Sequence, residues 1–270
     1  MKRNKIEQSV SEKIRCIKSG IEEVRFPDKH GHVNQDEEWC EIITKKERRR
    51  IRFHDYHKIF QVPGLYEEIF HGRLDCQSPF RVVRLLDDVV AESEIEIRDL
   101  KVLEIGAGNG IVGETLRAYG VRSIVGIDIL DEAKHAVERD RPDTYDNYFI
   151  VDFTDVPERQ EEQFRSRKFN CLVTVAALGF GDIPPDAFAK ALDLIEINGW
   201  LAFNIKEDFV YQADRSGFAQ LIDDLNRKQI IQTQAYRRYR HRYSITGAPL
   251  YYVAFVSRKL REVPDEILQD

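Results

Sequence analysis

The sequence predicts an α/β fold built on a mostly parallel sheet, and three observations support this prediction. From residue 101 to residue 205, short apolar runs alternate with segments that have the period of amphipathic helices. Strands that are apolar throughout and separated by helices are typical of a parallel sheet covered on both faces. The segments 232–245 and 249–259 are joined by a turn-rich spacer with no helix between them. We therefore expect these last two segments to pair antiparallel.

The N-terminal part of the chain differs from the remainder. Residues 1–50 form an extension with many charged and few large apolar residues, and we expect about the first thirty to be loosely attached. Near its end, WCEIIT and RRRIRFHDY flank a charged turn, which predicts a β-hairpin. We interpret the basic cluster KKERRR as a solvated face of this hairpin rather than as a nucleic-acid patch.

Residues 51–95 predict a helical cap. Two helices are expected in KIFQVPGLYEEIFHG (58–72) and SPFRVVRLLDDVVAE (78–92). Pro63–Gly64 precedes the first helix. In the second helix, Ser78 supplies the N-cap and Pro79 the proline of the first turn.

Residues 96–260 contain the strands of the predicted sheet, and residues 261–270 form a tail. The expected strands are 101–105, 123–128, 148–152, 169–178 and 200–205, followed by the terminal pair. The expected helices are one that ends at Gly120, then 131–140, 184–195 and 216–228, and Asn198–Gly199 is expected to form a turn.

Composition limits the possible functions. The 270 residues, 42% of them apolar, are enough for one large α/β domain with an appendage. A net charge of -6 does not favour a general nucleic-acid or membrane-surface binder. The four cysteines form no C-x-x-C pair, so neither a metal site nor a disulfide framework is expected. The charged start, MKRNKIEQSV, lacks the apolar run of a signal peptide. We expect a cytoplasmic protein, without a membrane span, that is a monomer or a homodimer.

A glycine-rich turn, GAGNG, follows the first predicted strand of the sheet. Such a turn can seat the cofactor of a dinucleotide-binding dehydrogenase or of an adenosyl-binding methyltransferase. Asp128, twenty residues after Gly108, fits the ribose-binding carboxylate of either. The pattern G-x-G-x-x-G fails at Ile111 when it starts at Gly106, and it lies too far from the strand end when it starts at Gly108. The glycines alone leave both alternatives open.

Four features together favour the methyltransferase. They are E-x-G-x-G-x-G from Glu104 to Gly110, GID at 126–128, VDF at 151–153, and the terminal antiparallel pair. In this order and spacing they resemble the class I S-adenosylmethionine-dependent methyltransferases of the small-molecule type, over about residues 98–258. The resemblance implies a Rossmann-like fold with a mostly parallel seven-stranded sheet, an antiparallel C-terminal strand and, here, an N-terminal helical cap. It also implies S-adenosyl-L-methionine as cofactor.

The resemblance implies roles for particular residues. They are Glu104, Gly106, Ala107, Gly108 and Gly110 for the methionine part of the cofactor, Asp128 and Ile129 for the ribose and purine, and Asp152 and Phe153 for the adenine. Asp128 has two acceptor oxygens for two ribose hydroxyls, and Glu104 suits the cofactor's ammonium. Structural interpretations stay open as well. Asp152 could cap a helix, and Glu104 could pair with a neighbouring Lys or Arg.

Known acceptor signatures of nucleic-acid methyltransferases are missing. The strand that could carry Asp/Asn-Pro-Pro-Tyr ends in VAALGFGD instead, and Ala176 or Ala177 stands where ribose methylases have an aspartate. Cys171 sits in an apolar run without a preceding proline, so we expect it in the core. These differences favour a small-molecule acceptor, with nucleic acid unlikely as a partner.

The cap predicts further site residues. Tyr56 and Tyr66 could contact the cofactor's carboxylate or its sulfonium. His54, His57 and His241 are candidates for a general base, which is needed only when the acceptor must lose a proton. YRRYRHRY, residues 236–243, is interpreted as a strand with tyrosines inward and arginines in water. An RNA methyltransferase and an inactive cofactor-binding scaffold remain the alternatives.

Overall fold

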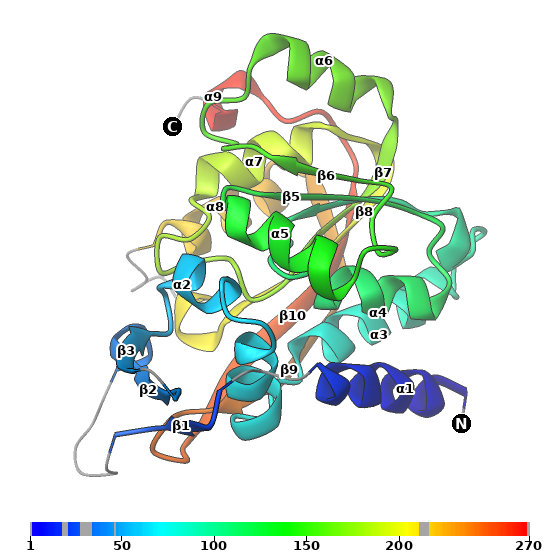
Figure 1. Ribbon diagram of the computed structural model, residues 1–270. Helices are drawn as coiled ribbons and strands as arrows, with labels where there is room; N and C mark the ends of the chain where they lie inside the picture. Colours follow the sequence, from blue (N-terminus) through cyan, green and yellow to red (C-terminus); the bar gives the residue numbers. More distant parts are fainter. Residues whose placement is uncertain (1, 18–20, 28–33, 46, 211–215, 269–270) are drawn as a thin grey trace.

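The computed structural model describes residues 2–17, 21–27, 34–45, 47–210 and 216–268. Its larger sheet consists of β4 (Lys101–Ile105), β5 (Ser123–Asp128), β6 (Asn147–Ile150), β7 (Phe169–Thr174), β8 (Ile195–Lys206), β9 (Ile231–Tyr243) and β10 (Pro249–Lys259). Figure 1 shows this sheet with helices packed around it. The seven strands lie in the order β6-β5-β4-β7-β8-β10-β9. The first five pair in parallel, and β10 runs antiparallel to both of its neighbours. The predicted sheet is confirmed.

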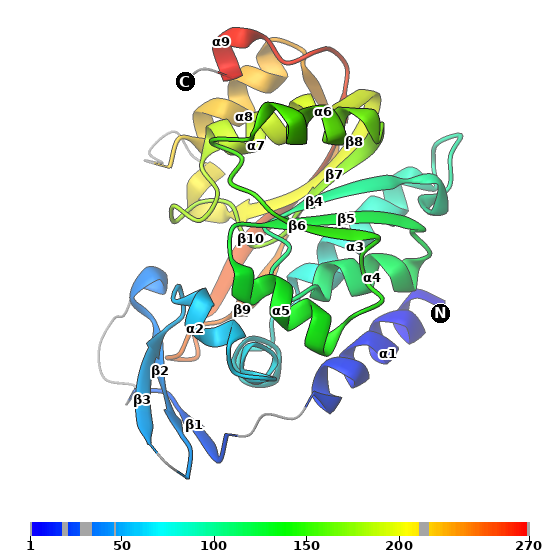
Figure 2. The same ribbon diagram turned by 45° about the horizontal axis from the view of Figure 1, so that its top comes forward.

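Helices cover both faces of this sheet. On one face lie α6 (Glu158–Ser166), α7 (Pro185–Asp193) and α8 (Phe218–Arg227), and on the other lie α3 (Ser78–Val90), α4 (Ile111–Tyr119) and α5 (Asp131–Asp140) (Figure 2). Two apolar cores result, one on each face. The central strands β4, β5 and β7 are covered from both sides, so their residues are buried at nearly every position rather than at every second one. The short elements η3 (Ile97–Asp99), η4 (Glu207–Val210) and α9 (Asp265–Leu268) lie between or after these.

A second, smaller sheet belongs to the N-terminal region. It consists of β1 (Glu23–Arg25), β2 (Trp39–Ile43) and β3 (Arg48–Arg52), all antiparallel, with η1 (Gln35–Glu37) before β2. The predicted hairpin is confirmed as β2 and β3. It is followed by α2 (Tyr56–Phe60) and by η2 (Glu67–Arg73), a π-helix. We call residues 21–77, within the described ranges, the cap. The second helix predicted for the cap is α3, which packs on the large sheet instead.

The helices of the cap differ from the prediction. The sequence predicts a helix after Pro63–Gly64, and η2 lies there, but with π-helical hydrogen bonding. The additional helix α2 ends before Pro63, which has no N–H to donate to a helix and ends the run. The cap has its own apolar core, in which Phe53 and Phe70 meet edge to face.

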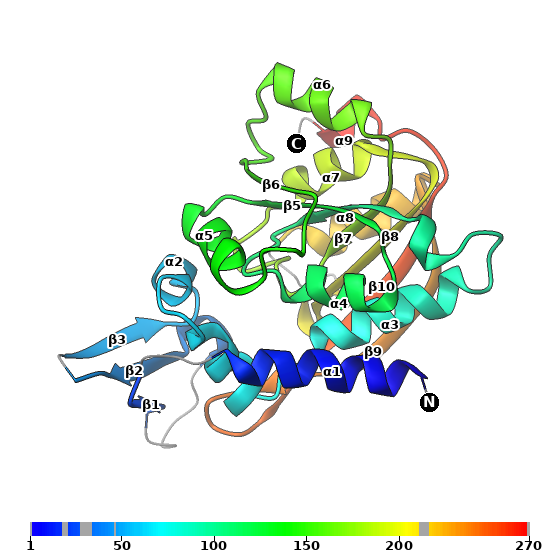
Figure 3. The ribbon, with the colours of Figure 1, turned by 45° about the vertical axis from the view of Figure 1, so that its right-hand side comes forward.

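The extreme N-terminus is not loosely attached, so that prediction is wrong for residues 2–16. They form α1 (Lys2–Cys16), which lies beside α3 and α4 (Figure 3). Val10 and Ile14 are one helical turn apart and are buried against Phe80 and Ile111. Ile6, one turn before Val10, is partly buried against the core around α3 and α4, so an apolar face attaches a helix whose other positions are mostly polar. Residues 18–20 and 28–30 of the same predicted segment lie outside the described residues.

Two further differences have local causes. Asn198–Gly199 is not a turn between elements but an irregularity within β8, where Asn198 has a φ of +67° and the pairing with β7 changes register. Helix α6 was not predicted, because Phe164 is its only buried residue and it shows little apolar period. None of the helices in the described part of the chain is long and apolar enough to cross a membrane.

Candidate active site

A cavity of about 290 Å³ lies where β4, β5, β6 and β7 end, with the cap across it. We call the part of the chain that carries the large sheet the core. It lines the cavity with residues 105–109, 127–130, 151–153, 175–177 and 181–184, among others. The cap lines it with His54, Tyr56, His57, Phe60, Tyr66, His71 and Cys76. Open parallel sheets bind ligands at the carboxyl ends of their strands, so the cavity lies where a cofactor is expected.

The glycine turn forms one wall of the cavity. Gly106 and Gly108 have φ values of +65° and +52°, a conformation that glycine adopts without strain. A Cβ on Gly106 would lie 2.7 Å from the Cβ of Ala177, so only glycine fits this position. Ala107 and Asn109 also line the cavity. Gly110, predicted to contact the cofactor, instead caps the N-terminus of α4 and lies outside the lining.

Asp128, the last residue of β5, is fixed by backbone donors. Its Oδ2 accepts a hydrogen bond from the Gly108 N–H at 2.8 Å, and its Oδ1 accepts one from the Leu130 N–H at 3.1 Å. Burial raises the pKa of this carboxyl, and the backbone N–H donors oppose that shift. Each oxygen keeps a lone pair that can accept a hydroxyl. The carboxylate therefore presents two fixed acceptor oxygens, which is what the two hydroxyls of a ribose require.

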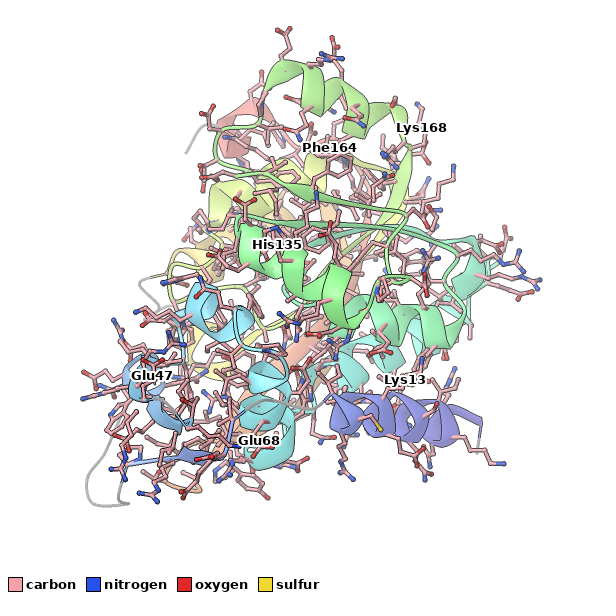
Figure 4. All side chains as sticks on the ribbon, in the orientation of Figure 1. Lys13, Glu47, Glu68, His135, Phe164 and Lys168 are labelled. Atoms are coloured by element: carbon pink, nitrogen blue, oxygen red, sulfur yellow. The ribbon has the colours of Figure 1, made fainter. Side chains whose placement is uncertain are left out.

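The adjacent residues suit a purine. Ile129 lines the cavity and its side chain is 58% exposed, so it offers an apolar surface to a purine. Asp152 accepts from the N–H and the hydroxyl of Thr154, both at Oδ1, and these bonds lower its pKa. Its Oδ2 can accept from an exocyclic amine. Phe153 is fixed by Phe164 of α6, which is labelled in Figure 4 and stacks on it with centroids 6.1 Å apart.

Glu104 lies beneath the glycine turn rather than in the cavity lining. Its side chain is 1% exposed and accepts a hydrogen bond from the Tyr145 hydroxyl at 3.1 Å. Burial raises its pKa to about 8; the Tyr145 bond opposes this and Asp128 adds to it. The alternative interpretation, in which Glu104 pairs with a Lys or Arg, is not observed among the described residues.

The cap wall is mostly aromatic. Tyr56 stacks on Phe60 with centroids 6.0 Å apart, and Phe60 contacts Tyr66 at 5.5 Å. Both predicted tyrosines thus reach the cavity. His54 Nδ1 lies 3.4 Å from Asp182 Oδ2, which belongs to the loop after β7. His57 is exposed at the rim.

His241 does not line the cavity, in contrast to the other two base candidates. It is 5% exposed, its Nδ1 lies 2.6 Å from the Ser78 hydroxyl, and its ring packs on Tyr252. Burial keeps its pKa well below the ordinary value. Its position follows from a β-bulge. The register between β9 and β10 shifts between Leu250 and Tyr251, and this turns two successive residues of β9, His241 and Arg242, inward.

Two other predictions for this strand are wrong. Arg242 is not in water but buried, and its Nη2 donates to Glu38 Oε2 at 2.5 Å. Tyr236, predicted to face inward, is 72% exposed. Ser78 is the first residue of α3 rather than its N-cap, and its hydroxyl bonds to His241 and Tyr239.

A buried polar cluster joins the cap to the glycine turn, and the sequence did not reveal it. Glu67 of η2 accepts from Asn109 Nδ2 at 2.7 Å and from Arg141 Nη1 at 2.8 Å. Arg141 also donates to the Asn109 carbonyl and, through Nε, to Glu114 of α4. Lys13 of α1, labelled in Figure 4, lies 3.4 Å from the other oxygen of Glu114. One indication of a buried charge is present in the sequence, because Glu67 and Glu68 stand between apolar residues in the segment 65–70.

Three titratable lining residues were also missed, namely His71, Cys76 and Asp182. Asp182 ends the strand-terminal sequence VAALGFGD, a position from which an acceptor site could have been inferred. The pKa of His71 is lowered to about 4, by burial first and then by Arg141. Burial raises the pKa of the Cys76 thiol to about 11, so it is neutral and a poor nucleophile at neutral pH.

The sheet order, the glycine turn and the two strand-end aspartates define a class I S-adenosylmethionine-dependent methyltransferase. The sequence comparison agrees, because residues 79–245 match the family described as "Methyltransferase domain". The match covers more than half of the chain, which therefore belongs to this family and is an S-adenosylmethionine-dependent methyltransferase. No curated protein sequence matches the chain significantly.

Solved structures share the fold. A protein of Pyrococcus horikoshii provisionally described as an RNA methyltransferase has a TM-score of 0.52 at 10% identity, over 94% of this chain and 98% of that one. A S-adenosylmethionine-dependent methyltransferase of Anabaena variabilis has a TM-score of 0.50 at 11% identity, over 77% of this chain and 96% of that one. At such identities the likeness shows the fold alone.

Proposed function

We propose that this methyltransferase acts on a small-molecule acceptor, which binds in the cavity between the cap and the core. The observation that supports this most is the position of the cap. His54, Tyr56, Phe60 and Tyr66 lie across the strand ends, so the acceptor must reach the cofactor between these side chains and the core. A site of this kind suits a small molecule more than a folded polymer.

In this proposal the core holds the cofactor. Asp128 accepts from the ribose hydroxyls, Ile129 and Phe153 flank the purine, and Asp152 accepts from the adenine amine. The backbone of residues 106–108 faces the methionine part, and Glu104 acts on the cofactor's ammonium from beneath the turn. Tyr56 and Tyr66 present ring faces or hydroxyls from the opposite side. Methyl transfer is an in-line displacement at the sulfonium, so alignment of donor and acceptor supplies much of the catalysis.

RNA is the second candidate, because β9 combines basic and aromatic residues. Tyr236 is exposed, and Arg237 and Arg238 stand beside it. However, Arg238 forms two hydrogen bonds to the Glu207 carboxylate and lies over the ring of Tyr251. Arg240 is similarly paired with Asp75. Arginines that are already neutralised offer less to a phosphate backbone, and this favours the small molecule.

The test uses the full chain and methyl-labelled S-adenosylmethionine. A small-molecule extract and purified RNA are offered in parallel, and the label is followed into each fraction. Label in the small-molecule fraction supports the proposal. Label in RNA, together with salt-dependent retention of the chain on RNA, supports the second candidate. Tight binding of S-adenosylhomocysteine without transfer to either pool supports an inactive scaffold.

The cytoplasmic location and the monomeric or homodimeric state stay predictions from the sequence. Gel filtration with light scattering tests the second of these directly.

A further inference from the structure

We propose that the acceptor is an amine that binds in its ammonium form, and that His54, oriented by Asp182, takes a proton from it before methyl transfer. This inference rests on the proposed function, because it concerns the part of the same cavity that the cofactor does not fill.

The acceptor space can be placed by elimination. With the nucleoside at Asp128 and Asp152 and the methionine part at the glycine turn, most of the remaining lining belongs to the loop after β7 and to the cap segment that begins at His54, and the rest is apolar. The charged side chain of that loop which faces the cavity is Asp182. His54 comes from the cap and Asp182 from the core, so the pair forms across the boundary between them.

The geometry of the pair suits proton transfer. Asp182 Oδ2 lies 3.4 Å from His54 Nδ1, so the carboxylate favours a proton on Nδ1 and leaves the lone pair on Nε2. The His54 ring is held between two others, Phe180 at 5.3 Å and Tyr56 at 5.8 Å, measured between centroids. A base oriented by a carboxylate is a common catalytic arrangement, and separations of this kind often shorten when substrate binds.

The charge and the rings of the cavity favour a cation. Asp182 adds to the effect of burial in raising the pKa values of Asp128 and Tyr56, so its field extends across the cavity. The aromatic faces of Tyr56, Phe60 and Tyr66 attract cations as well. An ammonium group gains from both features. A carboxylate or phosphate would be repelled, and an uncharged hydroxyl would gain little.

The reaction balances without a further reagent. The ammonium N–H bond breaks, its proton goes to His54 Nε2, and the resulting histidinium is stabilised by Asp182. The nitrogen lone pair then forms the N–C bond while the C–S bond of the sulfonium breaks and its electron pair stays on sulfur. The products are the methylated ammonium and neutral S-adenosylhomocysteine, and His54 returns its proton to water when the products leave.

Binding is tested first, on the full chain saturated with S-adenosylhomocysteine. Calorimetry compares 2-phenylethylamine, 2-phenylethanol and phenylacetate, and then propylamine, propanol and propionate. We expect the amine to bind at least about tenfold more tightly than its alcohol in one or both series, as a charge-assisted contact requires. Asp182→Asn should reduce that ratio to below about threefold, whereas the exposed control Asp143→Asn should keep it.

The outcomes separate the two proposals. If S-adenosylhomocysteine does not bind, the proposed function fails. If it binds but no amine does, or an alcohol or acid binds as well as its amine, the amine proposal is overturned and the cofactor assignment stands.

The role of His54 is tested with the amine that binds best. We expect His54→Ala to lower kcat by about a hundredfold with KM changed by less than about threefold, and added imidazole to restore part of the rate. His135→Ala is the matched control, because His135 is an exposed histidine on α5 (Figure 4). A wild-type kcat in His54→Ala, or a loss that imidazole does not restore, would overturn the proton-transfer role.

Discussion

The two walls of the cavity are built in different ways. The core wall consists of backbone turns at the ends of neighbouring strands. It is held by main-chain hydrogen bonds such as those from Ala107 to Ile127 and from Val151 to Asp128. The cap wall is held by side chains that meet from distant parts of the sequence, such as Glu67 and Arg141. Main-chain bonds persist through most substitutions and side-chain contacts do not. The core wall is therefore suited to an unvarying cofactor, and the cap wall to a particular acceptor.

The strongest test of this comparison is to break the core wall at Asp128. Asp128→Ala removes both carboxylate oxygens that we propose accept from the ribose, and it removes the partner of the Gly108 N–H. We expect S-adenosylhomocysteine to bind more weakly by about 3 to 5 kcal/mol, which is more than about a hundredfold. Calorimetry measures this, with Asp143→Ala as an exposed control. Affinity within twofold of the wild type would show that the ribose is held elsewhere.

A second test removes Glu67, whose side chain connects the cap wall to the core wall. Glu67→Ala leaves Arg141 buried with Glu114 as its remaining carboxylate and frees the Asn109 amide. We expect the free energy of unfolding to fall by about 3 kcal/mol, because a buried charge loses a partner. Cofactor affinity should fall as well, since Asn109 lines the cavity. Chemical denaturation and calorimetry measure the two effects.

Glu68→Ala is the matched control, since Glu68 neighbours Glu67 on η2 but pairs with Arg73 in partial exposure (Figure 4). We expect it to cost less than about 1 kcal/mol. Equal losses in the two variants would mean that the buried cluster does not join the walls.

The same difference explains what the sequence could predict. The core wall was predictable because each of its parts is local. An apolar run, a glycine turn and a following helix occur in continuous sequence from 101 to 119, and strand-end aspartates mark the neighbouring strands. The cap wall depends on contacts between segments far apart in sequence. Asn109 was visible within the glycine turn, but nothing near it indicated Glu67 as its partner.

His241 shows a second reason for failure. A one-residue bulge in β9 turns the successive residues His241 and Arg242 inward together, and no pattern in YRRYRHRY revealed that bulge. Helix α1 shows a third reason for failure. Its apolar face consists of few residues, and its burial became evident only from the packing of α3 and α4 around it.

A third prediction concerns Glu104, beneath the core wall. Its pKa is about 8 in the folded chain against an ordinary value of 4.5, so the folded state binds more protons between these limits and stability falls as pH rises through them. His71 and His241, whose pKa values are both lowered, have the opposite effect, mainly below pH 6.5. From pH 6.5 to 8 we therefore expect the free energy of unfolding to fall by about 1 to 2 kcal/mol.

Urea denaturation over this range measures the slope. Glu104→Gln should flatten it, and an unchanged slope in that variant would assign the effect to another group. If Glu104 also acts on the cofactor's ammonium, S-adenosylhomocysteine binding at pH 7 should release protons, which calorimetry in buffers of different ionisation enthalpy detects. No proton release would confine Glu104 to its bond with Tyr145.

The smallest effect on stability and activity is expected for His241→Gln, a substitution behind the cap wall. The ring bonds to Ser78, whose hydroxyl also contacts Tyr239 and Asn204, so most of that polar cluster persists in His241→Gln. We expect a loss of about 1 kcal/mol in the free energy of unfolding. Because His241 does not line the cavity, cofactor affinity and kcat should stay within twofold of the wild type. Thermal denaturation and turnover with the best acceptor measure these quantities. A large fall in kcat at unchanged stability would instead place the base behind the cap wall, and the cavity would then have to open toward β9 during turnover.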